Sequence, residues 1–250
     1  MFVQEGLYVN LAKKEADPIA LAFLNQGYHV AVVRYRTYLK DRKTVNSRAH
    51  FLGAVHDLME TLRLIHVHQE DWSIANEKVI LCGFSAGGHL VGYLAEHWDD
   101  NKVLTKYYPE LPAQIFKPSA VILSYTPTEL KSVKVQKNGI ISEIYQQLLQ
   151  MISECSMDEL NLIKHVRSDM SPVFLWQSSE DKIVSIQTTV NFYQALLAKQ
   201  IPCEAHFYQK GIHGVGLATN SYAKYPQDIS EQLQTWFPMA CQWLKEQSFL

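Results

Sequence analysis

The stretch Val79–Leu90, VILCGFSAGGHL, decides how the chain can fold. A short apolar run leads into a serine that stands between glycines, and a helical pattern of apolar residues follows it. Glycine is unfavourable inside regular structure, so the glycines at 83, 87 and 88 indicate a tight turn where two backbones approach closely. Residues 83–87 also match G-x-S-x-G, a turn that can present a serine as a nucleophile when a strand precedes it and a helix follows.

A glycine-rich turn between a strand and a helix can instead bind a phosphate group. That alternative is disfavoured, because the stretch lacks the lysine of G-x-x-x-x-G-K-[ST] and the spacing of G-x-G-x-x-G. The N-terminus of the following helix also suits a reaction centre that becomes negatively charged, since its free N–H groups carry a partial positive charge. Pattern and context together favour Ser85 as a nucleophile.

Strand and helix patterns alternate along the chain on both sides of this turn. Short β-branched or apolar runs predict buried strands at 28–35, 79–82, 120–124, 173–177 and 204–208. Amphipathic or capped patterns predict helices at 17–26, 47–68, 86–97, 186–199 and 238–247. This β-α repeat predicts an α/β protein with a mostly parallel central sheet and helices on both faces.

Residues 1–250 are expected to form a single domain that carries one long insertion. Residues 126–169 have no strong strand pattern and one polar helical stretch, SEIYQQLLQMI. A segment of this length is too long for a plain connection in a compact domain, so we expect a small helical cap or lid there.

The composition is that of a globular protein with a sizeable core. The 250 residues are 47% apolar and 19% charged with a formal net charge of −2, which disfavours a nucleic-acid or membrane-surface partner. No apolar run is long enough to span a bilayer, and the first ten residues have no signal-peptide pattern. The four cysteines are scattered without paired spacing, so we expect free thiols in a cytoplasmic protein, with a homo-oligomer left open.

A serine nucleophile needs a base, and the base needs an acid that orients it. The strand predicted at 173–177 is followed by a loop that contains Asp181, with Glu180 as the neighbouring alternative. The last predicted strand is followed by the loop sequence GIHG, which contains His213. The sequence therefore predicts a catalytic triad of Ser85, Asp181 and His213.

The other histidines show no metal-binding pattern, so we expect no metal ion and no cofactor. His66 and His68 lie two residues apart on a predicted helix and point to different faces. His89 lies one helical turn after Ser85, and we interpret it as a packing residue or as a polar group in the wall of the site.

With these motifs the chain resembles the bacterial acetyl-esterase and lipase-like branch of the α/β-hydrolases, close to acetyl-xylan-esterase-like serine hydrolases. The stretches that carry the resemblance span much of the chain, and they are 15–36, 78–90, 171–184 and 211–219. The resemblance implies the α/β-hydrolase fold and hydrolysis of small carboxylic, acetyl-type esters through an acyl-enzyme on Ser85. It also implies a small-molecule ester as the substrate and no cofactor.

The resemblance further implies an oxyanion hole, for which Ala86 N–H is one donor. In this family a strand leads into a glycine-rich loop that ends in a tyrosine and supplies another donor. Tyr8 matches that tyrosine, so Gly6 and Leu7 are the candidates for the second N–H group. The strand before the loop, which lies mid-sheet in the family, and the earlier edge strands are expected to be missing, as in an N-terminally truncated relative. The missing strand predicts low stability, because its neighbours would keep unpaired N–H and C=O groups. Only Gly6 remains of the loop's glycines in Glu5-Gly6-Leu7, which predicts weak activity through a poorer oxyanion hole.

Two other functions stay open from the sequence alone. The same triad serves peptidases and amidases of this fold, because the pocket and not the triad selects the leaving group. The missing strand and the altered loop before Tyr8 also fit a non-catalytic hydrolase-like protein that binds a ligand or partner. The complete triad argues for an enzyme instead.

Overall fold

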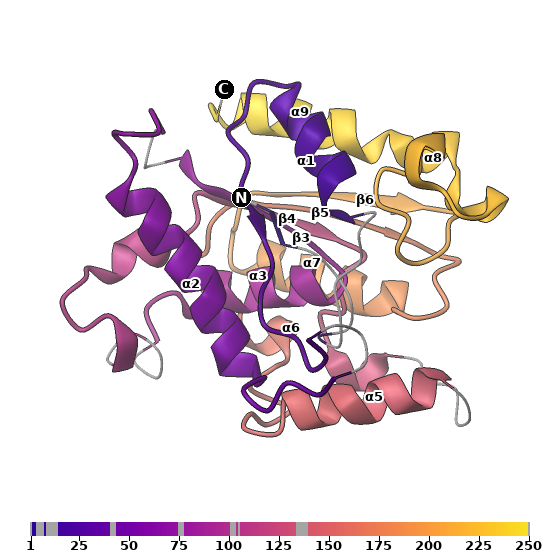
Figure 1. Cartoon of the computed structure of the whole chain (residues 1–250). Helices are drawn as coiled ribbons and strands as arrows, with labels where there is room; N and C mark the ends of the chain where they lie inside the picture. Colours follow the sequence, from indigo (N-terminus) through magenta and orange to yellow (C-terminus); the bar gives the residue numbers. More distant parts are fainter. Residues whose placement is uncertain are drawn as a thin grey trace.

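A computed structural model describes residues 2–3, 8, 15–40, 44–74, 78–100, 104, 106–133 and 140–249. Its centre is a sheet of six strands, all parallel, in the order β2-β1-β3-β4-β5-β6 (Figure 1). The strands are β1 (Phe2–Val3), β2 (Val32–Val33), β3 (Ile80–Phe84), β4 (Ala120–Ser124), β5 (Val173–Ser178) and β6 (Cys203–Tyr208). The predicted parallel sheet is confirmed.

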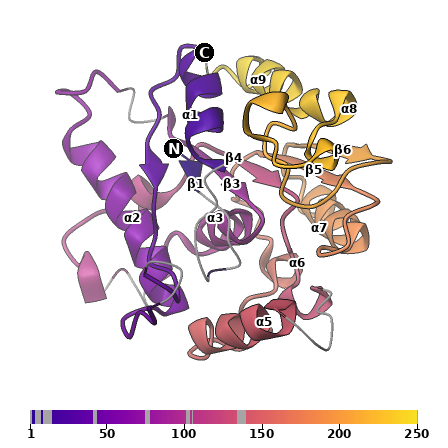
Figure 2. The same cartoon turned by 45° about the vertical axis from the view of Figure 1, so that its right-hand side comes forward.

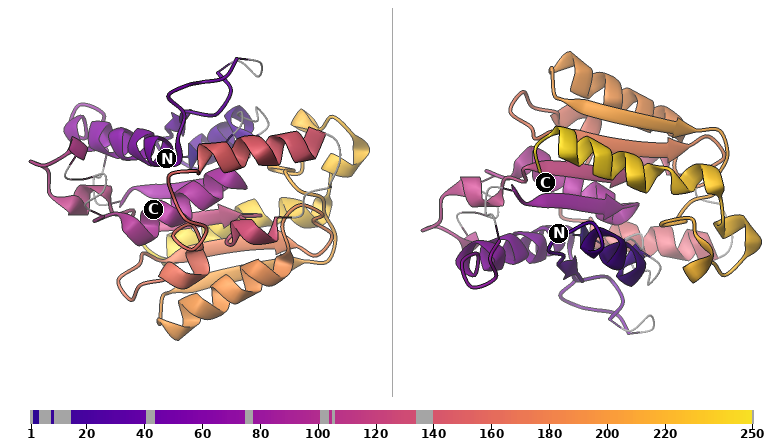
Figure 3. Two further views of the ribbon diagram at one scale, coloured as in Figure 1. Left: turned by 90° about the horizontal axis from the view of Figure 1, so that it is seen from below. Right: turned by 90° about the horizontal axis from the view of Figure 1, so that it is seen from above.

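Helices cover both faces of this sheet, as the views from below and above show (Figures 1 and 3). The helices of one face are α1 (Asp17–Leu24) and α9 (Trp236–Glu246), with the short α8 (Glu231–Gln234) before α9. The helices of the other face are α2 (Phe51–Val67), α3 (Ala86–His97) and α7 (Ile186–Ala198).

The side chains of the central strands alternate between two hydrophobic cores. In β3, Cys82 and Phe84 join the core that α1 and α9 share, whereas Leu81 joins the core that α2 and α3 share. Every residue of β3, β4 and β5 is buried. Burial on both faces explains why these strands are continuous apolar runs in the sequence instead of alternating ones.

The position of β1 corrects one prediction. The sequence predicted that no strand would lie between the strands at 28–35 and 79–82, but Phe2–Val3 lies there and pairs in parallel with both neighbours. Val3 stands opposite Gly83 of β3, two residues before Ser85. The sheet is therefore continuous through its middle, and the low stability expected from an open middle does not follow. The weak activity expected from the altered loop at 5–7 stays a prediction, since these residues lie outside the described part of the chain.

The edge strand is shorter than predicted. Among the described residues, the run 28–35 contributes Val32–Val33 to the ladder, where they pair with Phe2 and Val3. Helix α2 begins at Phe51 instead of near residue 47, since the His50 side chain accepts a hydrogen bond from Gly53 N–H and caps the helix. The other predicted helices agree with the structure to within a few residues.

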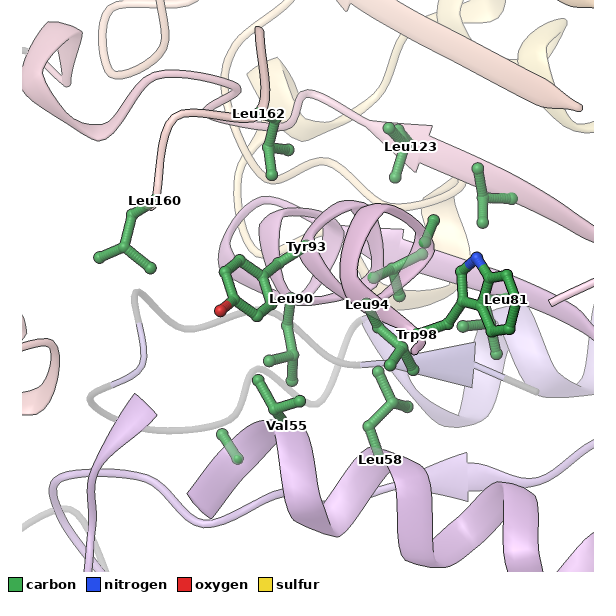
Figure 4. Packing of buried hydrophobic residues seen from close by; sticks show 14 of the residues in the cluster. Val55, Leu58, Leu81, Leu90, Tyr93, Leu94, Trp98, Leu123, Leu160 and Leu162 are labelled. Carbon is green, nitrogen blue, oxygen red and sulfur yellow. The ribbon is translucent and has the colours of Figure 1, made fainter. Parts of the chain in front are cut away.

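The insertion at 126–169 contains α5 (Ile140–Met151) and α6 (Leu162–His165), which lie on the side of α3 that faces away from the sheet (Figures 1 and 2). Leu160 and Leu162 belong to the same core as α3 and lie across α3 from the side chains of α2 (Figure 4). The insertion is helical as predicted, and its action as a lid stays a prediction.

Glycines set how closely β3 and α3 approach each other. A Cβ atom at Gly83 would lie 2.5 Å from the carbonyl oxygen of Gly87, and a Cβ atom at Gly88 would lie 2.0 Å from Thr126 Oγ1. Real Cβ atoms essentially never approach another heavy atom so closely. Both positions therefore require glycine, which is the physical reason for the glycine-rich pattern around Ser85.

We expect Gly83→Ala and Gly88→Ala each to lower the free energy of unfolding, by about 1–3 kcal/mol or more for overpacking of this kind. Thr126→Ala removes the hydroxyl that a new methyl group at position 88 would meet, so it should restore part of the stability of Gly88→Ala. It should not restore that of Gly83→Ala, whose obstacle is backbone. Urea unfolding of the single and double variants measures this difference, and equal rescue of both glycine variants would contradict the packing described.

Candidate active site

Ser85 lies at the junction between β3 and α3. Its backbone has φ 49° and ψ −118°, a conformation that is rare for a residue with a side chain and is therefore strained. Ser85 N–H donates to the carbonyl oxygen of Ser124 at 3.0 Å, and the Ser85 carbonyl oxygen accepts from His89 N–H at 3.0 Å. The strained turn is thus held from the end of β4 on one side and from the first turn of α3 on the other.

The structure brings the three predicted triad residues together. Ser85 Oγ lies 2.8 Å from His213 Nε2, and His213 Nδ1 lies 2.7 Å from Asp181 Oδ2. The Asp181 side chain is fully buried, and its Oδ1 accepts from the N–H groups of Ile183 at 2.8 Å and Val184 at 2.9 Å. The carboxylate is therefore fixed by its own loop, and the imidazole between it and Ser85 can accept the serine proton.

Glu180, the alternative acid, lies elsewhere. Its side chain is exposed, and its Oε2 accepts from Gly211 N–H at 3.4 Å. This contact ties the loop after β5 to the loop that carries His213. The structure thus places Asp181 against His213 and Glu180 against the backbone of the loop.

Two residues that the sequence did not indicate support the histidine loop. The ring of Tyr125, which directly follows β4, lies 5.0 Å from the ring of His213 between centroids. The Tyr125 hydroxyl accepts from Gly216 N–H at 3.1 Å and donates to the buried carboxylate of Glu15. Tyr125 could have been suspected from its place at the carboxyl end of a buried strand, where site residues gather. Nothing in the local sequence around Glu15 indicates this contact.

One of the predicted oxyanion donors can be placed. Ala86 is the first residue of α3, so its N–H is among the groups at the helix N-terminus that lack an acceptor within the helix. Gly6 and Leu7 lie outside the described residues. Tyr8, which follows them in the chain, is described and is fully buried.

His89 connects Tyr8 to a distant part of the chain. His89 Nε2 lies 2.8 Å from the carbonyl oxygen of Leu160, and His89 Nδ1 lies 2.7 Å from the hydroxyl of Tyr8. Burial lowers the pKa of His89 to about 4 and raises the pKa of Tyr8, so both groups are neutral near pH 7. A carbonyl oxygen can only accept, so Nε2 carries the ring proton and Nδ1 accepts from the Tyr8 hydroxyl.

The described part of the chain holds no other reactive cluster of the kinds that follow. Among those residues, no group of three or more His, Cys, Asp or Glu side chains is arranged to hold a metal ion. No described helix combines the length and the apolar character needed to cross a bilayer. The four cysteines are free thiols.

The profile of the BD-FAE family matches residues 2–196. The chain belongs to the BD-FAE family. It is 25% identical over 222 residues to an endo-1,4-β-xylanase B from Butyrivibrio fibrisolvens, with 89% of this chain and 33% of that protein covered. It is 24% identical over 240 residues to an acetylxylan esterase from Xylanibacter ruminicola, with 94% of this chain and 44% of that protein covered. This BD-FAE chain thus spans less than half the length of these two relatives.

Solved structures of similar proteins share the fold of this BD-FAE member. A carboxylesterase from Lactobacillus plantarum has a TM-score of 0.82 at 24% identity, with 100% of this chain and 86% of that chain covered. A sugar hydrolase from Lactococcus lactis has a TM-score of 0.75 at 29% identity, with 98% and 88% covered. An acetyl ester-xyloside bifunctional hydrolase from Caldicellulosiruptor lactoaceticus has a TM-score of 0.77 at 21% identity, with 100% and 83% covered. The predicted α/β-hydrolase fold and the predicted resemblance to esterase-type hydrolases are confirmed.

The buried His89 should make stability depend on pH. Its pKa is about 4 in the folded protein and about 6.5 in an unfolded chain, so between these values the unfolded chain binds more protons. The free energy of unfolding should therefore decrease as the pH falls from about 6.5 to about 4, by about 3 kcal/mol from this group. Urea unfolding across this range measures the slope.

One variant separates His89 from other titrating groups. His89→Gln has no titrating ring and should lose this part of the slope. An unchanged slope in His89→Gln would contradict the assignment of a neutral, buried imidazole.

Proposed function

We propose that the protein is a serine carboxylesterase that hydrolyses small, acetyl-type esters through an acyl-enzyme on Ser85. The observation that carries the proposal is the continuous chain of hydrogen bonds from Ser85 Oγ through His213 to Asp181, set on a strained turn at the N-terminus of a helix. Each member of this chain is held by separate contacts, so the arrangement does not depend on a substrate to form it.

The geometry supports the following reaction. His213 Nε2 takes the proton of Ser85 Oγ as the oxygen attacks the carbonyl carbon of the ester, and Asp181 holds the imidazole in the required tautomer and stabilises its positive charge. Ala86 N–H donates to the oxygen that becomes negative. His213 then gives the proton to the departing alcohol, and a water molecule, activated by the same imidazole, releases the acid from Ser85.

The second oxyanion donor is proposed to be the N–H of Gly6 or Leu7. The support is their position in the sequence directly before Tyr8, whose side chain bonds to the helix that follows Ser85. A second donor matters, because removing one donor from such a site typically lowers the rate by about 10²–10³.

The acetylated-sugar class of substrate is proposed from the relatives. An acetylxylan esterase and an acetyl ester-xyloside bifunctional hydrolase are both similar to this chain, and a carboxylesterase shares its fold with the highest TM-score quoted above.

The triad needs no metal ion or cofactor for this chemistry. The free thiols support action in the cytoplasm.

Asp181→Asn should lower kcat by about 10⁴, as the same change does in other triads, because the amide stabilises the wrong imidazole tautomer. Glu180→Gln is the matched control one residue away, and it should stay within a few-fold of the parent, since Glu180 contacts Gly211 and not the triad. Turnover of p-nitrophenyl acetate measures both variants. The opposite ranking would show that Glu180 is the acid of the site.

Short acyl chains should be preferred. We expect kcat/KM for p-nitrophenyl acetate to exceed that for p-nitrophenyl decanoate by about tenfold or more, since one extra methylene in an acyl pocket typically changes kcat/KM by about 10-fold to 200-fold. Treatment with EDTA should leave the activity unchanged, and Ser85→Ala should abolish it. Preference for the decanoate, or activity that chelation removes and zinc restores, would contradict the proposed substrate class or mechanism.

A further inference from the structure

Glu15 is a fully buried glutamate, two residues before α1, that the proposed mechanism does not use. Its Oε1 accepts from the Tyr125 hydroxyl, whereas its Oε2 is buried and has no hydrogen-bond partner among the described residues. We propose that Glu15 is a positioning residue: through Tyr125 it sets the tilt of the His213 imidazole. The inference rests on the proposed function, because the rate that it controls is that of the reaction at Ser85.

A carboxyl group at position 15 is not explained by stability alone. The residues that follow it, Ala16 and Ile19, belong to the apolar core that α1 and α9 share. Taking a carboxyl group out of water costs free energy, and one hydrogen bond offsets that cost only in part. An apolar side chain of the same length would fill the position without this cost. The carboxyl group therefore points to a role through the residue that it bonds, Tyr125.

Tyr125 is held in a strained conformation. It directly follows β4 and has φ 37°, which is rare for a residue with a side chain and persists only where the surroundings determine the backbone. Its N–H donates to the carbonyl oxygen of Trp176 at 2.9 Å, which holds the backbone. Its hydroxyl accepts from Gly216 N–H at 3.1 Å, so the single hydroxyl proton goes to Glu15. Glu15 thus fixes the direction of the hydroxyl and leaves its lone pair toward Gly216.

Gly216 anchors the loop that carries His213, three residues beyond the histidine. Its N–H donates to the Tyr125 hydroxyl, and its carbonyl oxygen accepts from Trp236 Nε1–H at 2.9 Å. Gly211, two residues before the histidine, is held by its own bond to the last residue of β5. The loop is therefore fixed on both sides of the histidine, and on the far side one of the two bonds comes from Tyr125.

The two bonds of the triad leave a tilt of the imidazole weakly restrained. Ser85 lies at Nε2 and Asp181 at Nδ1, so both bonds act in the plane of the ring and oppose movement out of that plane only weakly. A tilt would carry the loop backbone with it and would misalign the transfer of the serine proton. The ring of Tyr125 opposes the tilt, since its centroid lies 5.0 Å from that of the imidazole with 65° between the planes. The bond at Gly216 opposes the accompanying movement of the loop.

Two substitutions at position 15 separate the hydrogen-bond acceptor from the space that the side chain fills. Gln has the length of Glu and keeps an oxygen that can accept from the Tyr125 hydroxyl. Met has nearly the same length but only a weak acceptor, so Glu15→Met removes the acceptor while the position stays filled. If Glu15 acted only in packing or stability, both variants would keep the activity of the parent per folded molecule.

The positioning role predicts different activities for these variants. Glu15→Met should lower kcat for p-nitrophenyl acetate by about 10-fold to 100-fold with little change in KM, because a misaligned base slows the chemical step more than it weakens binding of the ester. Glu15→Gln, which keeps the acceptor, should stay within about threefold of the parent. Melting temperature confirms that both variants are folded before the rates are compared.

Tyr125→Phe tests the same bond from the other side. It keeps the ring against the imidazole and removes the hydroxyl that holds Gly216, so it should lower kcat as Glu15→Met does. The double variant should be no slower than the slower single one, because both changes break one connection. Tyr108→Phe is the matched control, since it breaks another tyrosine–glutamate bond, to Glu60 of α2, in the core on the other face of the sheet. It should leave kcat unchanged.

The rate at which a fluorophosphonate labels Ser85 gives a second readout that needs no ester turnover. The same imidazole must take the serine proton in this reaction, so a misaligned base slows it as well. The labelling rate should fall in Glu15→Met and Tyr125→Phe by a factor similar to the loss of kcat, and it should stay parent-like in Glu15→Gln.

The outcomes distinguish the two proposals. Parent-like kcat and labelling in folded Glu15→Met or Tyr125→Phe, or equal losses in the Met and Gln variants, would overturn the positioning role and leave the esterase proposal intact. A parent chain that is labelled at Ser85 but does not hydrolyse p-nitrophenyl acetate would contradict the proposed function. The labelling rates of the variants would then still decide the role of Glu15.

Discussion

The rest of the structure depends on how closely β3 and α3 approach at the turn that carries Ser85. Gly83 and Gly88 allow this approach, because any side chain there would overlap backbone or the hydroxyl of Thr126. The approach forces Ser85 into a strained conformation with φ 49° and presents it at the N-terminus of a helix. Strain of this kind persists only where the surroundings determine the backbone, and here β1 and β4 flank the strand on both sides.

The groups around Ser85 are each held by further contacts of the protein. Backbone N–H groups of its own loop fix Asp181, and the ring of Tyr125 lies against His213. His89 connects Tyr8 to the insertion. The buried polar atoms of the Asp181 and His89 side chains are all paired, and an unpaired group there would cost free energy. A site built in this way has its geometry before the substrate arrives, which electrostatic stabilisation of a transition state requires.

The parallel sheet and the three triad residues could be predicted from the sequence, and the reason is physical. In a parallel sheet the carboxyl ends of the strands meet at one edge, so residues after successive strands come together, and this is why Ser85, Asp181 and His213 were found. The strand β1 was missed because Phe2–Val3 is too short to show a periodic pattern. Contacts such as Glu15 with Tyr125, 110 residues apart, leave no local pattern at all, since they are decided by packing in three dimensions.

The strained turn and the bond to His213 favour Ser85 as the nucleophile of the site. The most direct measurement is to treat the parent protein with a fluorophosphonate, digest it and find the modified residue by mass spectrometry. We expect one phosphonyl group per chain, on the peptide that contains Ser85, with reaction slowed in Asp181→Asn and absent in Ser85→Ala. Modification of a different residue, or undiminished labelling of Ser85→Ala, would contradict it.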